Sequence, residues 1–302
     1  MPTFVSGQVE VSVPATSANL GPGFDSLGLA LDFRDRVAAS VIDSGVEITI
    51  SGAGEGEVPL DENHLVYQAM CRAFVEMNCE VPGLRLHCEN LIPHARGLGS
   101  SAAAIVAGIC AARGLVAGGS LLMDDDAVFN LAAGMEGHPD NVAPAFFGGF
   151  TVAWSANGRS FAEVISVDPR INVVVFVPPE PLETKVARDL LPETVSHAAA
   201  AANSGRAALL VAALSRQPEL LFPATEDLLH QDYREPAMPE TLRLVNALRA
   251  DRVPAVVSGA GPTVLAFADS SDRQGLQARV PDGWQALALL IDRRGVQISV
   301  SA

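Results

Sequence analysis

The residue pattern best suited to chemistry is a glycine-rich loop that leads into an alanine-rich helix, with the sequence PHARGLGSSAA at residues 93–103. Glycines let a backbone approach a ligand closely, and a helix start presents unpaired N–H groups at the positive end of the helix dipole. A phosphate group suits such a place. Ser100 or Ser101 could cap the helix, and a hydroxyl there could join the shell of a phosphate-bound Mg²⁺. The alternative is a well-capped helix after a tight turn.

Other nucleotide-binding patterns do not fit. Lys185 is the only lysine in the chain and no G-x-x-x-x-G precedes it, which excludes a Walker-type phosphate loop. The V-A-I-K and H-R-D motifs of protein kinases are absent. Gly97-x-Gly99-x-x-Ala102 satisfies a relaxed dinucleotide fingerprint, but residues 84–89 before it alternate apolar and polar side chains, whereas that motif follows a fully buried strand.

Two further loops carry polar residues among helix breakers. PATSANLGPGFDSLG at residues 14–28 follows a strand pattern directly, which suits a loop that presents polar side chains to a small polar substrate. An ordinary turn would use the same residues for backbone hydrogen bonds. VVSGAGPTV at residues 256–264 reads as two short strands around a glycine turn, and many hairpins share that pattern.

The elements that position these loops follow from hydrophobic periodicity. Strands are predicted at about 9–13, 46–50, 84–89, 172–177, 253–257, 264–268 and 287–291. Helices are predicted at 64–77, 100–113, 184–190, 195–214, 239–250 and 271–279, with another that starts at 124–126 and closes near 134–137. Strict βαβα alternation is absent, so an α+β fold is expected, with domains at 1–165 and 166–302.

Composition limits the partners. The chain has 302 residues, 49% of them hydrophobic, which is enough for buried cores and about two domains. The net charge of −15 argues against nucleic acid or an anionic membrane as the main partner, although a local pocket could hold a small phosphorylated ligand. The four cysteines form no C-x-x-C pair, no apolar run approaches the roughly 18 residues of a membrane span, and the N-terminal residues lack a signal-peptide layout. A cytoplasmic location is expected.

Together and in this order, the three loops resemble the three motifs of the GHMP small-molecule kinases. The segments that resemble homoserine kinases within that family are PATSANLGPGFDSLGLAL (14–31), GLGSSAA (97–103), EGHPDNVAP (136–144), TKVARDLLP (184–192), HQDYR (230–234) and SGAGPTVLAF (258–267). The resemblance covers essentially the whole chain. It implies an N-terminal α+β domain with a left-handed βαβ unit, a ferredoxin-like C-terminal domain, and ATP with Mg²⁺ in the cleft between them. The implied reaction is phosphorylation of the side-chain hydroxyl of L-homoserine.

The resemblance also implies the ATP site. Gly97, Gly99 and Ser100 would donate backbone N–H groups to the phosphates, Ser101 would be the magnesium ligand, and Asn63 in ENHLV would lie on the adenine side. The full set of implied ATP-binding residues is Asn63, Pro93, Arg96, Gly97, Leu98, Gly99, Ser100, Ser101, Ala102 and Ala103, and the third glycine motif adds Ser258, Gly259 and Gly261.

A zwitterionic substrate such as homoserine needs a cation for its carboxylate and an acid for its ammonium group. Arg188 and Arg234 match family positions at the substrate end, and a guanidinium fork suits a carboxylate. The other implied substrate contacts are Asn19, Asp25 and His138, and the implied catalytic step is Asp140-Asn141. Asp140 could be a general base or a group that holds the substrate ammonium. Because phosphoryl transfer depends mainly on positioning and charge stabilisation, we expect Asp140 to serve mainly in binding and orientation.

The magnesium site departs from the family pattern. Some homoserine kinases place a magnesium-binding glutamate eight residues before the histidine of the third-listed segment, where this chain has Asn130. Glu136 lies six residues further along and is not expected to take the same place. We therefore expect Mg²⁺ to be held by Ser101, waters and ATP.

Two other functions stay open at this point: a related GHMP kinase that acts on another small alcohol, and a non-catalytic relative that binds ligands. The presence of Arg188 and Arg234 disfavours the first, and the intact loop at 97–103 disfavours the second. The expected partners are L-homoserine and ATP, without nucleic acid or membrane, and a homodimer is expected from the family.

Overall fold

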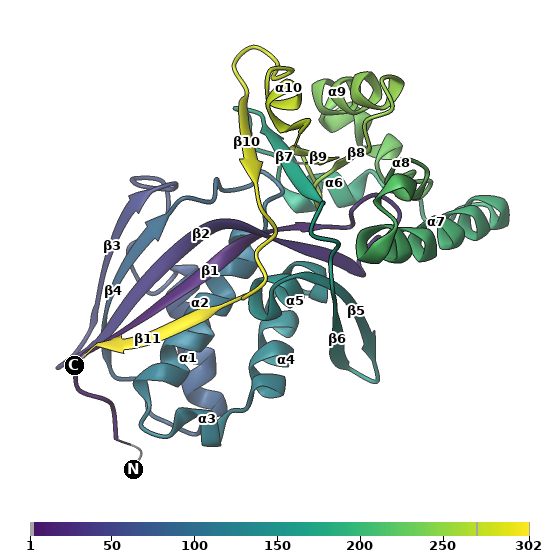
Figure 1. Cartoon of the computed structure of the whole chain (residues 1–302). Coiled ribbons are helices and arrows are strands. Elements are labelled where there is room, and N and C mark those ends of the chain that lie inside the picture. The colour runs from purple at the N-terminus through teal and green to yellow at the C-terminus, as the bar shows by residue number, and fades with distance from the viewer. Residues whose placement is uncertain (1–2, 270, 302) are drawn as a thin grey trace.

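Two β-sheets organise the chain in a computed structural model that describes residues 3–269 and 271–301 (Figure 1). Within these residues the first sheet has seven strands in the order β11-β1-β2-β4-β3, with β5 added through β2 and β6 through β5. Its strands are β1 (Gln8–Ala18), β2 (Leu27–Ile42), β3 (Val46–Gly52), β4 (Gly83–Asn90), β5 (Phe150–Ala156), β6 (Arg159–Ile165) and β11 (Gln297–Ser301). The last strand of the chain thus returns to pair antiparallel with the first long strand.

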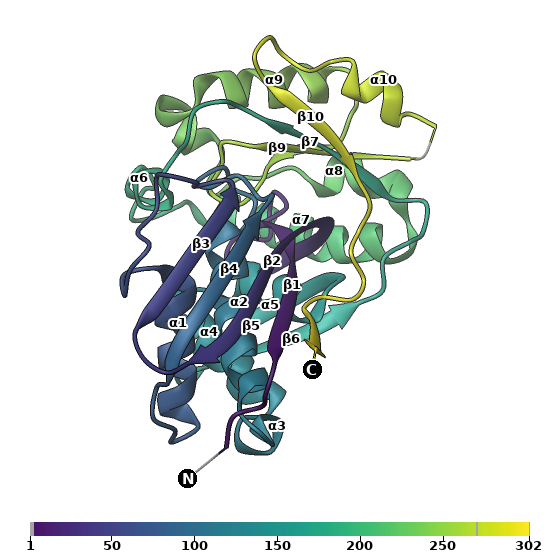
Figure 2. The same cartoon turned by 90° about the vertical axis from the view of Figure 1, so that its left-hand side faces the viewer.

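Helices cover one face of this sheet, which Figure 2 shows with β3, β4, β2 and β1 in front and the helices behind. They are α1 (Leu65–Glu76), α2 (Ser100–Leu115), α3 (Gly119–Leu122), α4 (Asp125–Glu136) and α5 (Pro139–Phe147). The alternating residues predicted for β4 behave as expected, because Leu84 and Leu86 are buried toward the helices while Arg85 points to solvent. Strands β3 and β4 pair in parallel with α1 between them, which is the expected βαβ unit.

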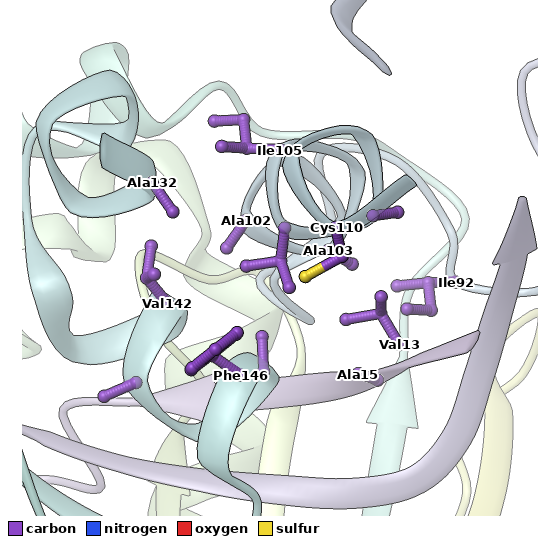
Figure 3. Packing of buried hydrophobic residues seen from close by; sticks show 14 of the residues in the cluster. Val13, Ala15, Ile92, Ala102, Ala103, Ile105, Cys110, Ala132, Val142 and Phe146 are labelled. Atoms are coloured by element: carbon purple, nitrogen blue, oxygen red, sulfur yellow. The ribbon is translucent and has the colours of Figure 1, made fainter. Parts of the chain in front are cut away.

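Helix α2 lies at the centre of the core and is packed on several sides (Figure 3). Its small residues Ala102 and Ala103 are completely buried, and side chains of β1 and α5 such as Val13 and Phe146 surround it. At Gly108 a Cβ atom would collide with a backbone carbonyl of α1, so glycine permits the close approach of the two helices. Tight packing holds the start of α2 in a fixed place. The glycine-rich loop of residues 93–99, which we call the phosphate loop after its predicted ligand, ends there.

The second sheet has the antiparallel order β10-β7-β9-β8. Its strands are β7 (Asn172–Val177), β8 (Ala255–Val257), β9 (Val264–Ala268) and β10 (Gln285–Leu289), and the helices of this half are α6 (Thr184–Asp189), α7 (His197–Arg216), α8 (Leu221–Ala224), α9 (Pro239–Ala250) and α10 (Arg273–Gln277). Numbered along the chain, the strand order is 4-1-3-2 with helices after the first and third strands. That is a ferredoxin-like arrangement, as expected.

The structure confirms the α+β class and each predicted helix and strand to within a few residues. The sequence reasoning missed α5, because Pro139 at its start and Pro144 inside it are signals of a turn. It also missed β2, a strand of 16 residues whose start was read as part of a loop, and the short helices α3 and α8. The hairpin of β5 and β6 and the exposed strand β11, whose residues are all exposed, were missed as well. The boundary near residue 165 stays a prediction.

Among the described residues, α7 is the one helix long and apolar enough in composition to cross a membrane. Length and composition do not separate a membrane span from a helix of a folded domain. Here α7 buries Leu210 and Leu214 in the core, and its Asn203 Nδ2 donates a hydrogen bond of 2.8 Å to the carbonyl of Pro22 in the first polar loop.

Candidate active site

The three loops predicted from the sequence meet in the cleft between the two sheets. The Gly259 N–H donates a hydrogen bond of 3.0 Å to the carbonyl of Ala18, and the Ser258 hydroxyl donates one of 2.6 Å to the carbonyl of Gly97. A Cβ atom at Gly97 would collide with the backbone of Ser258, so only glycine lets these two loops lie so close. The loops therefore form one rigid cluster.

A cavity of about 260 Å³ opens where the loops meet. The sequence-predicted residues that line it are Asn19, Arg96, Gly97, Gly99, Ser100, Ser101, His138, Asp140, Asn141, Arg188, Arg234 and Gly259. A second cavity of about 250 Å³ runs beside it along α2 and is lined by Asn63, Ser100, Ser101 and Ala103 among others. The predicted residues outside both linings are Asp25, Pro93, Leu98, Ala102, Ser258 and Gly261.

The start of α2 is free to bind an anion. Gly99 is the N-cap residue with a left-handed φ of 71°, and no side chain caps the helix within the described residues. A Cβ atom at Gly99 would overlap the hydroxyl of Thr16, so this position requires glycine for two reasons. The suggestion that Ser100 or Ser101 caps the helix is wrong. The N–H groups of the first turn keep the capacity to bind phosphate oxygens.

Ser101 faces the carboxylate of Glu136, a contact that the sequence did not predict. The Ser101 hydroxyl donates a hydrogen bond of 2.7 Å to Oε2 of Glu136, the last residue of α4. Helix α4 thus brings Glu136 to the start of α2, and the left-handed Gly137 ends α4 directly after it. Asn130 lies six residues earlier in α4. Its side chain is engaged by β6, because its Oδ1 accepts a hydrogen bond of 2.9 Å from the Ser160 N–H.

Glu136 and Ser101 make a plausible ligand pair for a hard cation in chemical terms. Burial raises the pKa of Glu136, with the Ser101 hydrogen bond and His138 opposing that rise. A nearby cation would relieve the cost of keeping this carboxylate charged. No group of three or more His, Cys, Asp and Glu side chains gathers as a metal site anywhere in the described part of the chain. One carboxylate and one hydroxyl suit Mg²⁺, which usually keeps waters and phosphate oxygens as its other ligands.

Helix α5 presents the Asp-Asn step to the cavity. His138 is its N-cap residue, and the His138 Nδ1 and Asp140 Oδ1 atoms lie 2.8 Å apart. The hydrogen bond to Asp140 raises the pKa of His138, against the effect of burial. The Thr16 hydroxyl donates a hydrogen bond of 2.8 Å to Oδ1 of Asn141 and so fixes the direction of that amide. A Cβ at Gly28 of β2 would collide with the Asp140 carbonyl, so α5 depends on glycine there to sit this close.

Two arginines from the second half of the chain face this helix start. Arg188 of α6 forms a two-pronged pair with Asp25, at 2.5 Å to Oδ1 and 3.1 Å to Oδ2. The hydrogen bond to Asp25 raises the pKa of Arg188. Both arginines lie over the ring of Phe24, with guanidinium carbons 5.4 Å and 5.7 Å from its centroid for Arg188 and Arg234. Phe24 thus holds two cations near one another at the cavity wall.

Arg234 is a buried cation without a carboxylate partner in hydrogen-bond reach among the described residues. It is 1% exposed, and its Nη1 contacts the Gly259 carbonyl and His230 Nδ1, each at 3.1 Å. Its Nε makes no hydrogen bond with any residue that the structure describes. Burial, and then the positive charge of Arg188, lower the pKa of Arg234 to about 10. Such a site favours an incoming anion, because its negative charge would offset both the desolvation of Arg234 and the repulsion from Arg188.

Two predicted ligand residues are engaged within the protein. Asn19 bridges two loops, since its Nδ2 donates to the Gly259 carbonyl at 2.8 Å and its Oδ1 accepts from the Asp25 N–H at 2.9 Å. Arg96 donates to the carbonyls of His94 and Pro178 at 2.9 Å and 3.0 Å, and also to that of Pro179. Arg96 therefore ties the phosphate loop to the end of β7.

The sequence reasoning missed Glu136, Thr16, Phe24 and His230 as parts of the site. Glu136 carried a signal, because a helix that ends at Gly137 brings both Glu136 and His138 to the end of α4. His230 is completely buried, and its Nε2 lies 2.7 Å from the Gly21 carbonyl. Burial lowers the pKa of His230, which suits a neutral ring that accepts from Arg234 and donates to Gly21. Nothing in the local pattern marks Thr16 or Phe24, whose partners lie far along the chain.

Comparison with known proteins finds relatives of the GHMP kinase family along nearly the whole chain. Residues 64–149 match the model for the GHMP kinases N terminal domain, and residues 198–286 match that for GHMP kinases C terminal. The chain is 52% identical over 299 residues to the homoserine kinase of Streptomyces avermitilis, which covers 98% of this chain and 97% of the relative. It is 49% identical to the homoserine kinase of Clavibacter michiganensis, over 97% of this chain and 94% of the relative.

Solved structures agree with these matches. The homoserine kinase of Cytophaga hutchinsonii superposes with a TM-score of 0.83 at 26% identity, over 98% of each chain. Mevalonate diphosphate decarboxylase of Staphylococcus aureus superposes with a TM-score of 0.69 at 14% identity, over 97% of this chain and 98% of that one, which shows a shared fold alone.

Proposed function

Since this chain belongs to the GHMP kinase family, and within it to the homoserine kinases, we propose that the cleft between its sheets is where ATP phosphorylates L-homoserine. The reaction converts the side-chain hydroxyl of L-homoserine to O-phospho-L-homoserine, in threonine biosynthesis. One observation carries the assignment of the site: the start of α2 and the arginines Arg188 and Arg234 line the same cavity. A phosphate site and a carboxylate site thus lie within the reach of one small substrate.

The phosphates of ATP bind over the loop that ends at Gly99. The free N–H groups of the first turn of α2 and the left-handed Gly97 and Gly99 support this placement. The nucleoside extends into the second cavity, which shares Ser100 and Ser101 with the first and includes Asn63 in its lining. Arg96 contributes by holding the loop to the second half of the chain, because its hydrogen bonds run to backbone carbonyls.

Mg²⁺ is held by Ser101 and Glu136 together with phosphate oxygens and waters. The contact of 2.7 Å between the Ser101 hydroxyl and the Glu136 carboxylate at the start of α2 supports this, and the burial that raises the pKa of Glu136 makes a nearby cation favourable. When bound, the ion would neutralise negative charge that accumulates on the phosphates during transfer.

Homoserine binds with its carboxylate toward Arg234 and Arg188. No described carboxylate lies within hydrogen-bond reach of Arg234, so a substrate carboxylate provides a direct counter-charge. The ammonium group then meets the acidic side of the cavity, which Asp140 lines, and the Asp25 carboxylate stays on Arg188. This orientation directs the hydroxyl of homoserine to the phosphate loop.

In the transfer step the homoserine oxygen forms a bond to the γ-phosphorus while the bond from that phosphorus to the β–γ bridging oxygen breaks, and ADP leaves. The hydroxyl proton passes to an acceptor in the cavity or to solvent. Asp140 serves mainly to bind and orient the substrate, since one of its oxygens already contacts His138 and phosphoryl transfer depends on positioning more than on a strong base. Asn141 lines the cavity beside Asp140, and the hydrogen bond from Thr16 fixes the direction of its amide.

The direct test measures ADP release by the purified chain with Mg-ATP and L-homoserine, mevalonate, galactose or no acceptor. Homoserine-dependent turnover is the expected result. Turnover with another acceptor would preserve the ATP site and refute the substrate assignment. Folded protein that binds ATP and phosphorylates none of these compounds would favour a non-catalytic ligand-binding relative.

The homodimer and the cytoplasmic location stay predictions. Light scattering during size-exclusion chromatography measures the first, and a mass near 63 kDa is the expected result for two chains of 31.5 kDa.

A further inference from the structure

One carboxylate lies in the second cavity, on the side of the sheet that faces α2. Asp35 of β2 lines this cavity of about 250 Å³, and it is the only acidic residue among the lining residues. Several apolar side chains surround it, namely Val37, Val58, Val66 and Ala107. The largely apolar space beside α2 suits an aromatic ring, and Ser100 and Ser101, which also line it, lie at the start of α2.

Only one of the two oxygens of Asp35 is used within the protein. Oδ1 accepts hydrogen bonds from the N–H groups of Leu91 and Ile92, at 2.7 Å and 2.8 Å. Oδ2 accepts none from the described residues. Because Oδ1 is anchored by two backbone groups just before the phosphate loop, the carboxylate cannot rotate freely and Oδ2 keeps a fixed direction.

The Asp35 carboxylate has lost most of its contact with water in the folded protein. Asp35 is 7% exposed, and burial raises its pKa to about 6, with the two backbone hydrogen bonds opposing the rise. At neutral pH the group is therefore mostly charged, and Oδ2 stays open to the cavity with no donor among the described residues. A ligand that donates a hydrogen bond to Oδ2 would recover part of the cost of this burial.

Adenine has one hydrogen-bond donor on its ring system, the 6-amino group, whereas guanine and hypoxanthine carry an acceptor oxygen at the same position. A fixed carboxylate oxygen attracts the 6-amino group of adenine and repels the oxygen that guanine and hypoxanthine carry at the same position. We propose that Asp35 recognises adenine by accepting a hydrogen bond from its 6-amino group at Oδ2. The inference rests on the proposed function, because it requires the base of ATP to occupy this cavity.

Two other uses of Oδ2 are chemically less suited. A phosphate oxygen would be repelled by the carboxylate, and the phosphates have the N–H groups at the start of α2. A ribose hydroxyl is also a donor, so it is the competing partner that the experiment must distinguish from the amino group.

The experiment compares three nucleotides with the wild-type enzyme and Asp35→Asn: ATP, purine riboside 5′-triphosphate, which lacks the 6-amino group, and 2′-deoxy-ATP. Each assay measures kcat/KM for the nucleotide at saturating L-homoserine. In Asp35→Asn the amide oxygen can still accept from Leu91 and Ile92, while an N–H group replaces Oδ2. Glu89→Gln, which makes the same chemical change on the exposed side of β4, is the matched control.

The wild-type enzyme is expected to prefer ATP over purine riboside triphosphate by about 10- to 100-fold, the value of a hydrogen bond to a charged group. Asp35→Asn should lose about 10- to 100-fold with ATP and less than about threefold with purine riboside triphosphate, so that the preference disappears. Loss of the 2′-hydroxyl should cost both enzymes the same factor. Glu89→Gln should keep the wild-type preference.

Three results would overturn the inference. An equal loss with ATP and purine riboside triphosphate means that Asp35 only supports the loop at residues 91–92. A coupling of Asp35→Asn to the 2′-hydroxyl assigns Oδ2 to the ribose. Equal use of ATP and purine riboside triphosphate by the wild-type enzyme refutes the contact without any variant, even if Asp35→Asn does not fold. Absence of homoserine-dependent turnover in the wild-type enzyme with ATP would instead refute the proposed function.

Discussion

Replacing Arg234 by methionine should remove homoserine binding while leaving the protein folded. Arg234→Met keeps much of the side-chain volume at a position that is 1% exposed and removes the guanidinium. The lowered pKa of Arg234, about 10, corresponds to roughly 3 kcal/mol against the charged form in the ligand-free protein. Removing the charge recovers a free energy of that order.

The contacts of Arg234 offset this gain. Losing the hydrogen bond to the buried His230 Nδ1 at 3.1 Å costs about 1–3 kcal/mol, because that nitrogen is left without its donor. Losing the contact with the Phe24 ring costs about 1 kcal/mol. The Gly259 carbonyl keeps its hydrogen bond from Asn19, so it stays satisfied. The free energy of unfolding should therefore change by less than about 2 kcal/mol.

The effect on homoserine should be much larger. Removing one partner of a buried charge pair costs about 2–5 kcal/mol, which is about 30- to 5,000-fold in affinity. The assay measures KM for L-homoserine and for ATP, with urea unfolding of each ligand-free protein. Arg216→Met, at the exposed end of α7, is the control and should leave all three quantities unchanged.

Two results would refute this reasoning. A KM for homoserine within about threefold of wild type would show that Arg234 does not bind the carboxylate. A parallel rise in KM for ATP, together with a loss of more than about 4 kcal/mol in the free energy of unfolding, would show that Arg234 mainly supports the fold.

Three further predictions follow from the site. Glu136→Gln should raise the Mg²⁺ concentration for half-maximal rate by about tenfold or more at fixed ATP, and an unchanged Mg²⁺ titration would remove Glu136 from the metal site. Asp140→Asn should raise KM for homoserine by about tenfold with a smaller fall in kcat, whereas a large fall in kcat with KM intact would identify a general base. Because its pKa is raised to about 6, Asp35 binds a proton more tightly in the folded chain than in the unfolded one. Its contribution to stability is therefore present below about pH 4 and is lost, by up to about 3 kcal/mol, as the pH rises through 6. Urea unfolding of Asp35→Asn between pH 4 and 7 should lack this slope relative to wild type, and an equal slope in both would contradict the prediction.

The elements of the fold were largely predictable because their signals are local. Strand β4 is buried on one face, which produces the alternation of Leu84, Leu86 and Cys88. Helix α2 is buried on most sides, which produces its alanine-rich run. Such burial patterns indicate whether a segment forms a strand or a helix.

Two of the missed segments have weak local signals: α5 contains two prolines, and β11 is exposed along its length. Strand β2 was missed although its apolar residues Leu29, Leu31 and Val37 are buried, because glycines 21, 23 and 28 indicated a loop at its start. Strand β11 forms because β1 offers it an edge, which depends on the rest of the sheet.

For the site, the sequence alone determined which loops carry the chemistry. The glycines at 97 and 99 and the serines after them predict an anion site from local backbone properties, and the motif resemblance supplied Arg188, Arg234 and Asp140. Counting along the chain failed where the backbone changes direction. Glu136 lies six residues after the position expected for a glutamate, yet the packing of α4 against α2 brings it to Ser101.

Only the tertiary structure decided which partners these side chains take. Arg188 pairs with Asp25 across 163 positions, and Thr16 orients Asn141 across 125. It also left one oxygen of Asp35 without a donor, and Arg234 without a carboxylate in hydrogen-bond reach, among the residues that the structure describes. Such contacts join segments brought together by the packing of two sheets, so no pattern within one segment contains them. The chemistry of each loop is local, but the charge balance of the site is a property of the whole fold.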